Sequence, residues 1–462
     1  MAKSTAPENF QNLTAQLSKQ IATLKYEDFP EELKKRARQL FADGMAVAVA
    51  GSFQEEPPKL LAENAKEMGG APQASVIGFG FKTSMAQAAM VNGGSMHVLD
   101  YEPMWSPPNH QLSTCLPAIL ALAENRGMSG KAVLTAMVKA IETMCAVRAA
   151  SNQKNLNEVP FHPPGMVGPL GATVGVAELL DLDADGIRNA LGIVGSRCGS
   201  LLANTGTGTK CLHCGQSSFV GLDSALLAEK GYSGNPDILE APKGYILSFF
   251  GYEDFNAELL LGYGINFRIV NPGYEIKRFP SNFATYLPIL SAIDVRDRIS
   301  DISQISKITI KGPYLPYVSR PAPVTGLDGK FSVQYTTVRA LLDGNITLQS
   351  FTDEARFEPA VEELLAITEF EMDKNMPAEI GKAWFSTDVT LKDGMVVSSQ
   401  LNPADFIFGA TPISPEAHRV KLESCFSTRM NSDDTNRAIE LCSTIDSLSS
   451  EEFKELMDIV RC

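Results

Sequence analysis

The sequence predicts a mainly α-helical protein that combines a large all-helical domain with a smaller α+β domain. Helical periodicity runs almost without interruption as far as residue 270. The pattern changes near residue 274, where strand-like alternation and a hairpin signal lie between helices. Amphipathic helices return after residue 414. A chain of 462 residues also exceeds the size that one hydrophobic core supports, so two or three domains are expected.

The first part of the chain repeats apolar residues at helical spacing. In residues 31–49, Leu33, Ala37 and Leu40 share one face, and Gly51 is expected to end the helix. The same periodicity predicts further helices at residues 85–98, 116–126, 130–150, 167–182, 184–200 and 219–230. Several of these segments are rich in glycine and alanine, which lets neighbouring helices approach closely. The only strand signal in this part lies in the segment 75–79.

Residues 273–412 are expected to form the α+β domain. The predicted elements are helices at residues 281–295 and 334–342, a strand at residues 305–311 and a hairpin over residues 386–400. The hairpin has the strongest local signal, because Asp393-Gly394 suits a tight turn between two alternating segments.

Residues 413–462 are expected to return to the helical domain. Amphipathic helices are predicted at residues 416–425, 435–445 and 451–460. Only the body formed by residues 1–272 is large enough to bury their apolar faces, so the helical domain should be discontinuous in sequence.

Composition narrows the class of partner and the compartment. The chain has 54 acidic and 40 basic residues, a net charge of −14, which disfavours nucleic acid and anionic membranes as partners. It has no run of about 18 uncharged apolar residues that would indicate a membrane span, and residues 1–11 lack signal-peptide and transit-peptide features. Eight scattered cysteines are too few for a disulfide scaffold and fit a reducing compartment. A cytoplasmic location is therefore the expectation.

The stretch between His97 and His110 is the first candidate for a functional site. It follows a predicted helix, carries Asp100 and Glu102, and contains two adjacent prolines that rule out a continuous helix. Imidazole titrates near neutral pH and a partly buried carboxylate can be tuned toward it, so Asp100 and His110 are candidates for proton transfer. The alternative is that the histidines only satisfy backbone groups and that Glu102 is solvated.

Two further segments place histidines beside helix-starting or polar residues. In residues 161–165, His162 precedes two prolines at the start of a helix, whose N-terminus favours a carboxylate. Residues 204–215 run through a Gly-Thr stretch to Lys210 and His213. This stretch lacks the spacing of a Walker-type motif and does not follow a strand, which argues against a nucleotide loop.

Cys211 and Cys214 in the same segment have metal-type spacing. A single pair leaves a tetrahedral zinc site without its other ligands, so two buried small residues at a helix start are the stronger interpretation.

The fourth candidate segment, residues 275–286, carries Lys277 and Arg278 immediately before a proline that suits a helix start. Two adjacent bases here would direct positive charge into the cleft between domains, where ligands usually bind. The alternative is a solvated basic pair on a linker.

Five motifs in this order resemble the MmgE/PrpD family. They are Leu99-Asp-Tyr-Glu, Phe161-His-Pro-Pro-Gly, Thr209-Lys-Cys-Leu-His-Cys-Gly, Ile276-Lys-Arg-Phe-Pro and Pro316-Tyr-Val-Ser-Arg-Pro. The resemblance extends over nearly the whole chain, and the motifs are specific only when taken together. The family contains 2-methylcitrate dehydratase, cis-aconitate decarboxylase and iminodisuccinate epimerase, and these motifs are most similar to the decarboxylase branch.

The resemblance implies a lyase with a site that needs neither cofactor nor metal, in the cleft between a helical domain and an α+β lid, usually in a homodimer. The substrate would be a small anionic di- or tricarboxylic acid, and the preferred reaction is decarboxylation of cis-aconitate or an alkyl-substituted aconitate-like acid. Dehydration of 2-methylcitrate or an alkylcitrate, and epimerisation of an iminodisuccinate-like acid, are the alternatives. By the same resemblance the catalytic residues are Asp100, His110, His162 and Tyr317, and the substrate-binding residues are Lys210, His213, Lys277, Arg278, Met104 and Tyr286.

Two of these positions depart from the decarboxylase pattern. Met104 stands where those enzymes carry a threonine, and Tyr286 stands where they carry a histidine. A site built for a hydrogen bond discriminates strongly when that bond is missing. A more apolar pocket, suited to an alkyl-substituted acid, is therefore expected.

Two other classes stay open at this point. A protein that binds a metabolite without transforming it would share the same charged residues. An iron–sulfur hydratase would need three thiolates, and only Cys211 and Cys214 lie close together in sequence.

Overall fold

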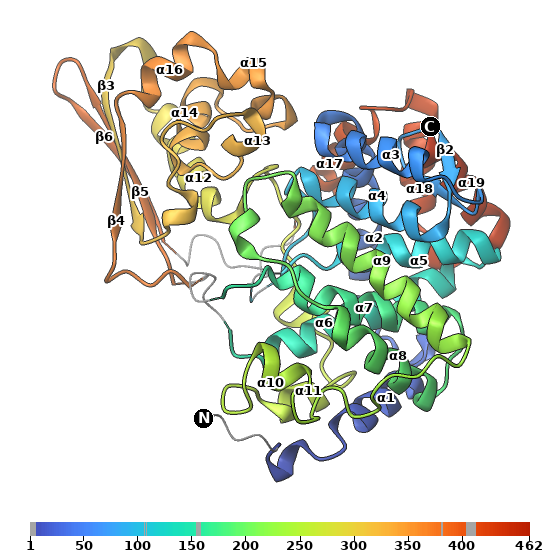
Figure 1. The fold of residues 1–462 in the computed structure, drawn as a ribbon. Coiled ribbons are helices and arrows are strands. Elements are labelled where there is room, and N and C mark those ends of the chain that lie inside the picture. Colours follow the sequence, from blue (N-terminus) through green and yellow to red (C-terminus); the bar gives the residue numbers. More distant parts are fainter. Residues whose placement is uncertain (1–5, 106, 108, 154–158, 380–381, 403–412) are drawn as a thin grey trace.

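The computed structural model describes residues 6–462 apart from 106, 108, 154–158, 380–381 and 403–412. Figure 1 shows a large helical body and a smaller body in which helices lie along one face of a sheet. The predicted fold class, mainly α with a smaller α+β part, is confirmed.

The large body is built from helices that surround one continuous apolar cluster. They are α1 (Leu13–Thr23), α2 (Glu31–Gln54), α3 (Glu56–Met68), α4 (Met85–Val98), α5 (Leu112–Arg126), α6 (Gly130–Ala150), α7 (Pro163–Leu179), α8 (Ala184–Val194), α9 (Thr209–Glu229), α10 (Tyr245–Phe249) and α11 (Ala257–Leu261). Two short strands, β1 (Ala74–Val76) and β2 (Phe81–Thr83), pair antiparallel beside them. Helices α4 and α6 begin and end where the sequence predicts.

Several predicted boundaries in this body are wrong. Helix α5 begins at Leu112 instead of residue 116, α7 spans Pro163–Leu179 instead of 167–182, and α8 ends at Val194 instead of residue 200. Gly51 does not end α2, which continues to Gln54. A Cβ on Gly51 would lie 1.9 Å from the backbone oxygen of Ser95 in α4, so this glycine permits close packing of two helices. Helix α9 begins at Thr209, well before the predicted start at residue 219. The strand expected at 75–79 ends at Val76, and a turn then leads to β2 at Phe81.

The smaller body contains a four-stranded sheet and several helices. Its elements are α12 (Tyr286–Arg296), β3 (Ile305–Pro313), α13 (Gly326–Gly329), α14 (Val333–Asp343), α15 (Asp353–Arg356), α16 (Pro359–Leu365), β4 (Thr368–Asp373), β5 (Phe385–Leu391) and β6 (Val396–Leu401). The strand order is β4-β3-β5-β6, and only the β3–β4 pair is parallel. The predicted hairpin at Asp393-Gly394 is confirmed as β5–β6, and Gly394 takes the positive φ of 87° that the turn requires. Helix α12 starts at Tyr286, five residues after the predicted 281, because a 3-10 turn capped by Asn282 precedes it.

The last three helices are α17 (Pro415–Phe426), α18 (Ser432–Ser443) and α19 (Ser450–Arg461). Their buried residues, among them Leu422, Phe426, Leu441 and Phe453, belong to the same apolar cluster as α2. Figure 1 shows these helices, in red, beside the blue N-terminal helices. The domain bounds 1–272, 273–412 and 413–462 stay a prediction. Among the described residues, no helix combines the length and the apolar character needed to cross a membrane.

Candidate active site

Helices α4 and α9 cross at two glycines, and this crossing creates the centre of the site. A Cβ on Gly93 would lie 2.7 Å from Cα of Gly215, and a Cβ on Gly215 would lie 2.2 Å from the backbone oxygen of Met90. Only hydrogen fits at both positions, so the helices approach backbone to backbone. The approach brings His97, about one turn beyond Gly93, to Lys210, about one turn before Gly215. Their side-chain nitrogens Nε2 and Nζ lie 2.9 Å apart.

Asp100 connects this crossing to the smaller body. It follows the end of α4 in a left-handed conformation with φ of 48°, which is uncommon outside glycine. Lys210 Nζ donates to its Oδ2 at 2.9 Å, and Lys277 Nζ donates to its Oδ1 and, at 2.7 Å, to its backbone oxygen. Lys277 also donates to the backbone oxygen of Ser281 at 3.1 Å and is fully buried. One carboxylate therefore holds two ammonium groups that are 67 positions apart in the sequence.

The segment that carries Lys277 is fixed beside Asp100 by its own backbone. Met104 and Glu275 form an antiparallel bridge in which each backbone N–H donates to the other residue's oxygen at 3.0 Å. Lys277 lies two positions beyond Glu275. The bridge thus places the ammonium of Lys277 against the loop that contains Asp100.

Glu102 is the second carboxylate of the site and is fully buried. Its Oε1 lies 2.7 Å from Nδ1 of His97, and Ser113 donates to the carboxylate through its hydroxyl at 2.6 Å and its backbone N–H at 2.9 Å. Burial alone would raise the pKa of Glu102, but the contacts with His110 and His97 outweigh it and the pKa is lowered. The interpretation of Glu102 as a solvated acid is therefore wrong.

His110 lies between the two carboxylates. Its Nε2 is 3.8 Å from Oδ1 of Asp100, and its Nδ1 is 3.4 Å from Oε1 of Glu102, within ion-pair distance but without the geometry of a hydrogen bond. Its ring centroid lies 4.5 Å from that of His97, edge to face. The imidazole can thus exchange a proton without first breaking a strong hydrogen bond at Nδ1.

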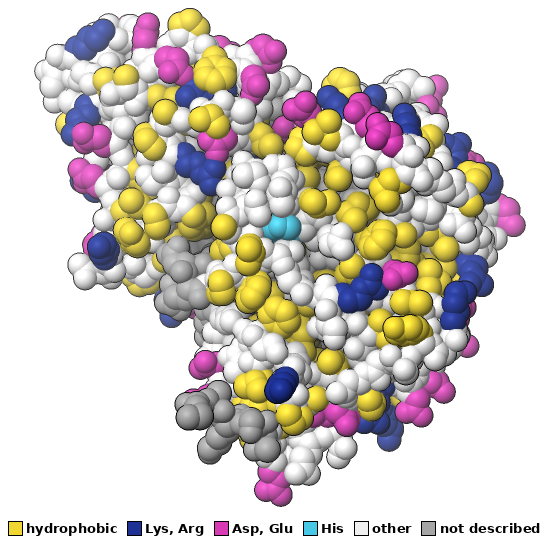
Figure 2. Space-filling view, in the orientation of Figure 1, with side chains coloured by type: hydrophobic (Ala, Val, Ile, Leu, Met, Phe, Trp, Pro, Cys, Tyr) yellow, Lys and Arg dark blue, Asp and Glu magenta, His cyan; other side chains and the backbone are white. Residues whose placement is uncertain are grey.

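His162 and His213 extend the row of imidazoles. His162 is the residue before Pro163, the first residue of α7, and its backbone N–H donates to the backbone oxygen of Ser200. Nδ1 of His162 lies 3.2 Å from Nδ1 of His213 in α9, so one ring donates and the other accepts. Ring centroids are 5.8 Å apart for His97 and His162. Figure 2 shows histidine surface, in cyan, between the two bodies on this face of the molecule.

All four imidazoles are neutral at physiological pH. Burial, followed by the charge of Lys210, lowers the pKa of His97 to about 3 and that of His213 to about 4. The pKa values of His110 and His162 are lowered as well, with burial as the main cause. Burial also raises the pKa of Asp100, but Lys210 and Lys277 outweigh it, so Asp100 is ionised.

Two models of known protein domains together match most of the chain. The MmgE/PrpD N-terminal domain model matches residues 15–258, and the MmgE/PrpD C-terminal domain model matches residues 279–446. The chain belongs to the MmgE/PrpD family.

The relatives of this MmgE/PrpD protein described next are named for two different enzyme activities. Cis-aconitate decarboxylase of Homo sapiens is 30% identical over 375 residues, which cover 78% of this chain and 76% of the relative. The Mus musculus enzyme of the same name is 28% identical and covers 95% of this chain and 91% of its own length. The mitochondrial 2-methylcitrate dehydratase of Yarrowia lipolytica is 25% identical and covers 70% of this chain and 66% of the relative.

The remaining predicted site residues of this MmgE/PrpD chain lie at different depths. Tyr317 is half-buried and close enough for the charge of Asp100 to raise its pKa, after burial as the larger cause. The side chain of Arg278 is exposed, whereas its neighbour Lys277 faces the cluster. Met104 is buried and is bridged through its backbone as described.

The hydroxyl of Tyr286 is engaged with backbone. It donates to the backbone oxygen of Phe279 at 2.8 Å and accepts from the N–H of the same residue at 3.1 Å. These two bonds brace the segment that follows Lys277. A direct role of Tyr286 in substrate binding stays a prediction.

His97 and Glu102 are members of the cluster that sequence reasoning omitted from its list of site residues. Both belong to the stretch that it singled out, and their spacing of five residues places them on either side of a helix end. The available signal was that His97 ends a predicted helix just before Asp100. The sequence alone did not show that Lys210 would lie opposite His97 in the folded protein.

His97, Glu102 and His110 also have the spacing of a metal site, since their ligand atoms lie within 4.8 Å of one another. A metal ion on Nδ1 of His97 would move the ring proton to Nε2, where the ammonium of Lys210 is 2.9 Å away. The donor set therefore fits a hydrogen-bonded proton network better than a resident cation.

Proposed function

We propose that this protein is an MmgE/PrpD lyase that decarboxylates cis-aconitate or an alkyl-substituted aconitate-like acid in the Asp100–His110–His162–Lys210–Lys277 cluster. Dehydration of 2-methylcitrate or an alkylcitrate is the second candidate, because one of its named relatives is a 2-methylcitrate dehydratase. A homodimer and a cytoplasmic location belong to the same proposal.

The observation that carries the proposal is the sharing of Asp100 by two lysines. The ammonium groups of Lys210 and Lys277 are balanced by Asp100 and Glu102 while the imidazoles stay neutral. A di- or tricarboxylic acid brings new negative charge into this balanced group. Its carboxylates can take ammonium donors from Asp100 through charge-assisted hydrogen bonds, and its charge favours protonation of a nearby imidazole.

His97 is held in one tautomer and contributes indirectly to the transfer of ammonium donors from Asp100 to the substrate. Its Nδ1 proton faces ionised Glu102, so its Nε2 accepts from Lys210. This bond keeps Lys210 aligned between Asp100 and the space that a substrate carboxylate would occupy. His97 is thus a positioning residue, and His110 or His162 moves the proton.

In a decarboxylation, the bond between the departing carboxylate and its carbon breaks, and the electron pair is delocalised into the remaining conjugated acid. Lys210 and Lys277 stabilise the developing negative charge, and protonated His110, protonated His162 or Tyr317 supplies the proton that completes the product. In a dehydration, the neutral imidazole instead removes a proton beside a carboxylate, and an acid protonates the leaving hydroxyl. Both reactions need fixed positive charge around a carbanion-like state.

The two departures from the decarboxylase pattern bear on the substrate. Met104 has a thioether in place of a hydroxyl. The hydroxyl of Tyr286 is already hydrogen-bonded to the backbone of Phe279. At these positions the acid therefore finds fewer hydrogen-bond partners and more apolar surface. An alkyl-substituted acid would gain from that surface by about 0.8 kcal/mol for each buried methylene group.

The experiment is an NMR product screen. Purified enzyme is incubated in deuterated water with cis-aconitate, 2-methylcitrate, alkylcitrates and iminodisuccinate, with a His110→Ala variant as the control. The proposal predicts loss of a carboxyl group from an aconitate-like acid, with deuterium incorporated, and a reaction at least about 100-fold slower in the control. Tight binding of these acids without turnover or deuterium exchange would instead identify a metabolite-binding protein.

A further inference from the structure

Tyr101 lies between the two carboxylates of the site, and a lysine from the far end of the chain contacts it. Nζ of Lys421, in α17, donates to the backbone oxygen of Tyr101 at 2.9 Å and lies 3.9 Å from the centre of its ring. The hydroxyl of Tyr101 donates to the backbone oxygen of Arg278 at 3.3 Å. Tyr101 thus joins α17 to the segment that carries Lys277.

The ammonium of Lys421 is held in turn by Asp43 of α2. Nζ lies 2.9 Å from Oδ1 of Asp43, and Nε2 of His418 lies 3.2 Å from Oδ2 of the same carboxylate. Asp43 is fully buried, and Lys421 and His418 are 5% and 6% exposed. The group lies where α17 packs on α2, which are the red and blue helices of Figure 1.

Burying such an ion pair is an inefficient way to stabilise a fold, because the loss of hydration offsets most of the attraction between the charges. A second observation points to the site. Successive backbone oxygens, those of Asp100 and Tyr101, each accept from a buried lysine, Lys277 and Lys421 respectively. Asp100 has a positive φ, and a non-glycine residue keeps that conformation only when its surroundings hold it.

We propose that Lys421, anchored by Asp43, is a positioning residue that fixes the Tyr101 peptide and thereby aims the carboxylates of Asp100 and Glu102. Without its donor, the peptide between Tyr101 and Glu102 is free to rotate, and both carboxylates move relative to Lys210 and His110. The inference rests on the proposed lyase function and extends it to residues outside the catalytic cluster.

The test compares two buried lysines that differ in location. Lys421→Met removes the charge beside Tyr101, and Lys139→Met removes a fully buried lysine that pairs with Glu178 on the α6–α7 side of the body. Both variants should lose thermal stability. Only Lys421→Met should lose kcat, by about 100-fold, because a displacement of the order of 1 Å in the catalytic groups costs that much. KM should be unchanged, since Lys210 and Lys277 remain.

The double variant Asp43→Asn with Lys421→Met separates positioning from folding, because it leaves no buried unpaired carboxylate. The inference predicts a folded protein whose kcat is as low as that of Lys421→Met. A folded double variant with the wild-type kcat would overturn it, and so would a double variant that fails to fold while Lys139→Met folds, since the pair would then be structural. A wild-type enzyme without turnover on any acid of the product screen would count against the proposed function itself.

Discussion

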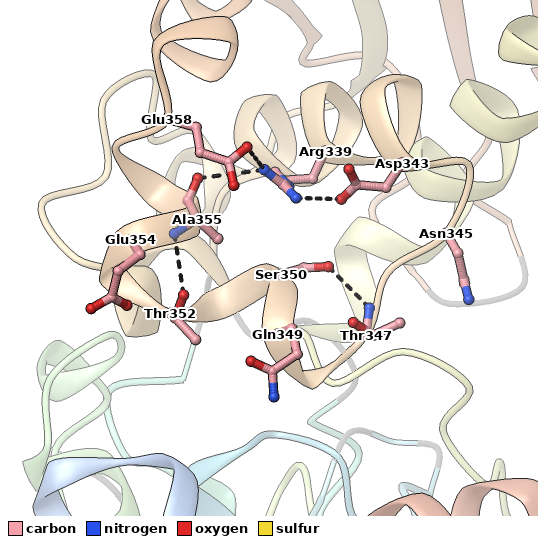
Figure 3. Close-up of a pocket in the computed structure, with 10 residues that line it drawn as sticks. All are labelled: Arg339, Asp343, Asn345, Thr347, Gln349, Ser350, Thr352, Glu354, Ala355 and Glu358. Carbon is pink, nitrogen blue, oxygen red and sulfur yellow. Dashed lines mark hydrogen bonds and ion pairs between the residues drawn. The ribbon is translucent and has the colours of Figure 1, made fainter.

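Two charged regions of this molecule, the histidine–lysine cluster and a pocket in the smaller body, differ in how their charges are satisfied. The pocket is a hollow of about 420 Å³ beside Arg339, and its lining residues all come from the short stretch 339–358 (Figure 3). Arg339 is ion-paired there with Asp343 and Glu358, whose side chains are 35% and 50% exposed. In the cluster, by contrast, Asp100 and Glu102 are buried, and the two lysines that pair with Asp100 come from remote segments.

The difference teaches that burial and distance in sequence mark the site better than the presence of a hollow. Charges in the pocket pair within one short stretch of the chain and stay partly exposed to solvent, which costs little and needs no ligand. Asp100, Lys210 and Lys277 are removed from water and meet only because the whole fold brings them together. Burying charges in this way is unfavourable, and it is typical of functional sites.

The largest expected effect separates the two regions by activity. His110→Ala should lower kcat by about 100-fold to 10,000-fold, the usual contribution of a general acid or base, and Lys277→Ala should abolish turnover. Arg339→Met, in the pocket, should leave kcat and KM unchanged. The measurement is steady-state kinetics with the acid found by the product screen. Near-normal activity of either cluster variant, with a normal circular dichroism spectrum, would rule out the assignment.

The second prediction concerns the charge of Glu102. Glu102→Gln keeps the shape of the side chain but removes the charge that fixes the Nδ1 tautomer of His97, so the bond from Lys210 is weakened. The expected loss in kcat is about 10- to 100-fold. A loss of this order is usual when the hydrogen-bond partner that orients a metal-binding histidine is removed. Glu358→Gln, at the pocket, is the matched control and should have no effect. Equal kinetics of the two variants would contradict the network.

The third prediction uses pH and protein stability. The pKa of His97 is lowered to about 3 in the folded protein, whereas the unfolded chain binds that proton near pH 6.5. The unfolded state therefore binds more protons below pH 6.5, and the free energy of unfolding falls as pH falls. Through this difference, His97 lowers the free energy of unfolding by about 1.2 kcal/mol between pH 6 and pH 5.

Urea unfolding at those two pH values measures this slope. His97→Gln should reduce it by about that amount, and Arg339→Met, in a pocket lined by no histidine, should leave it unchanged. An identical slope in wild type and His97→Gln would show that His97 is not held neutral.

The smallest expected effect concerns proton uptake on binding. Because the two lysines are already balanced by carboxylates, an arriving polyanion should raise the pKa of His110 or His162 and draw a proton from solution. Calorimetric titrations of a tricarboxylate in two buffers with different ionisation enthalpies should give different apparent heats, and Arg339→Met should reproduce the difference. Equal heats in both buffers would show that the imidazoles do not titrate on binding.

Sequence reasoning could predict much of this because the informative features are local. Helical periodicity located α4 and α6, the Asp-Gly dipeptide located the β5–β6 hairpin, and chemically unusual stretches located Asp100, His110, His162, Lys210 and Lys277. These features depend on neighbours within a few residues of one another, which is the range over which propensities and turn preferences act.

What escaped prediction depends on contacts between distant segments. Gly51 resembles a helix end in the sequence, and only the position of Ser95, 44 residues later, shows that it permits close helix packing. Lys421 reaches the backbone of Tyr101 across 320 positions of sequence. Sequence periodicity does not predict a contact between segments so far apart, because tertiary packing decides which helix faces come together.

The most direct test of the central claim uses the five histidines of the chain. Four of them, His97, His110, His162 and His213, lie in the cluster, and His418 lies outside it beside Asp43. Protein labelled with ¹⁵N at histidine is titrated with a tricarboxylate while the imidazole resonances are followed. The account predicts that the imidazole resonances of the four cluster histidines shift together while the resonance of His418 is unchanged. Shifts confined to His418, or binding that moves none of the four, would contradict it.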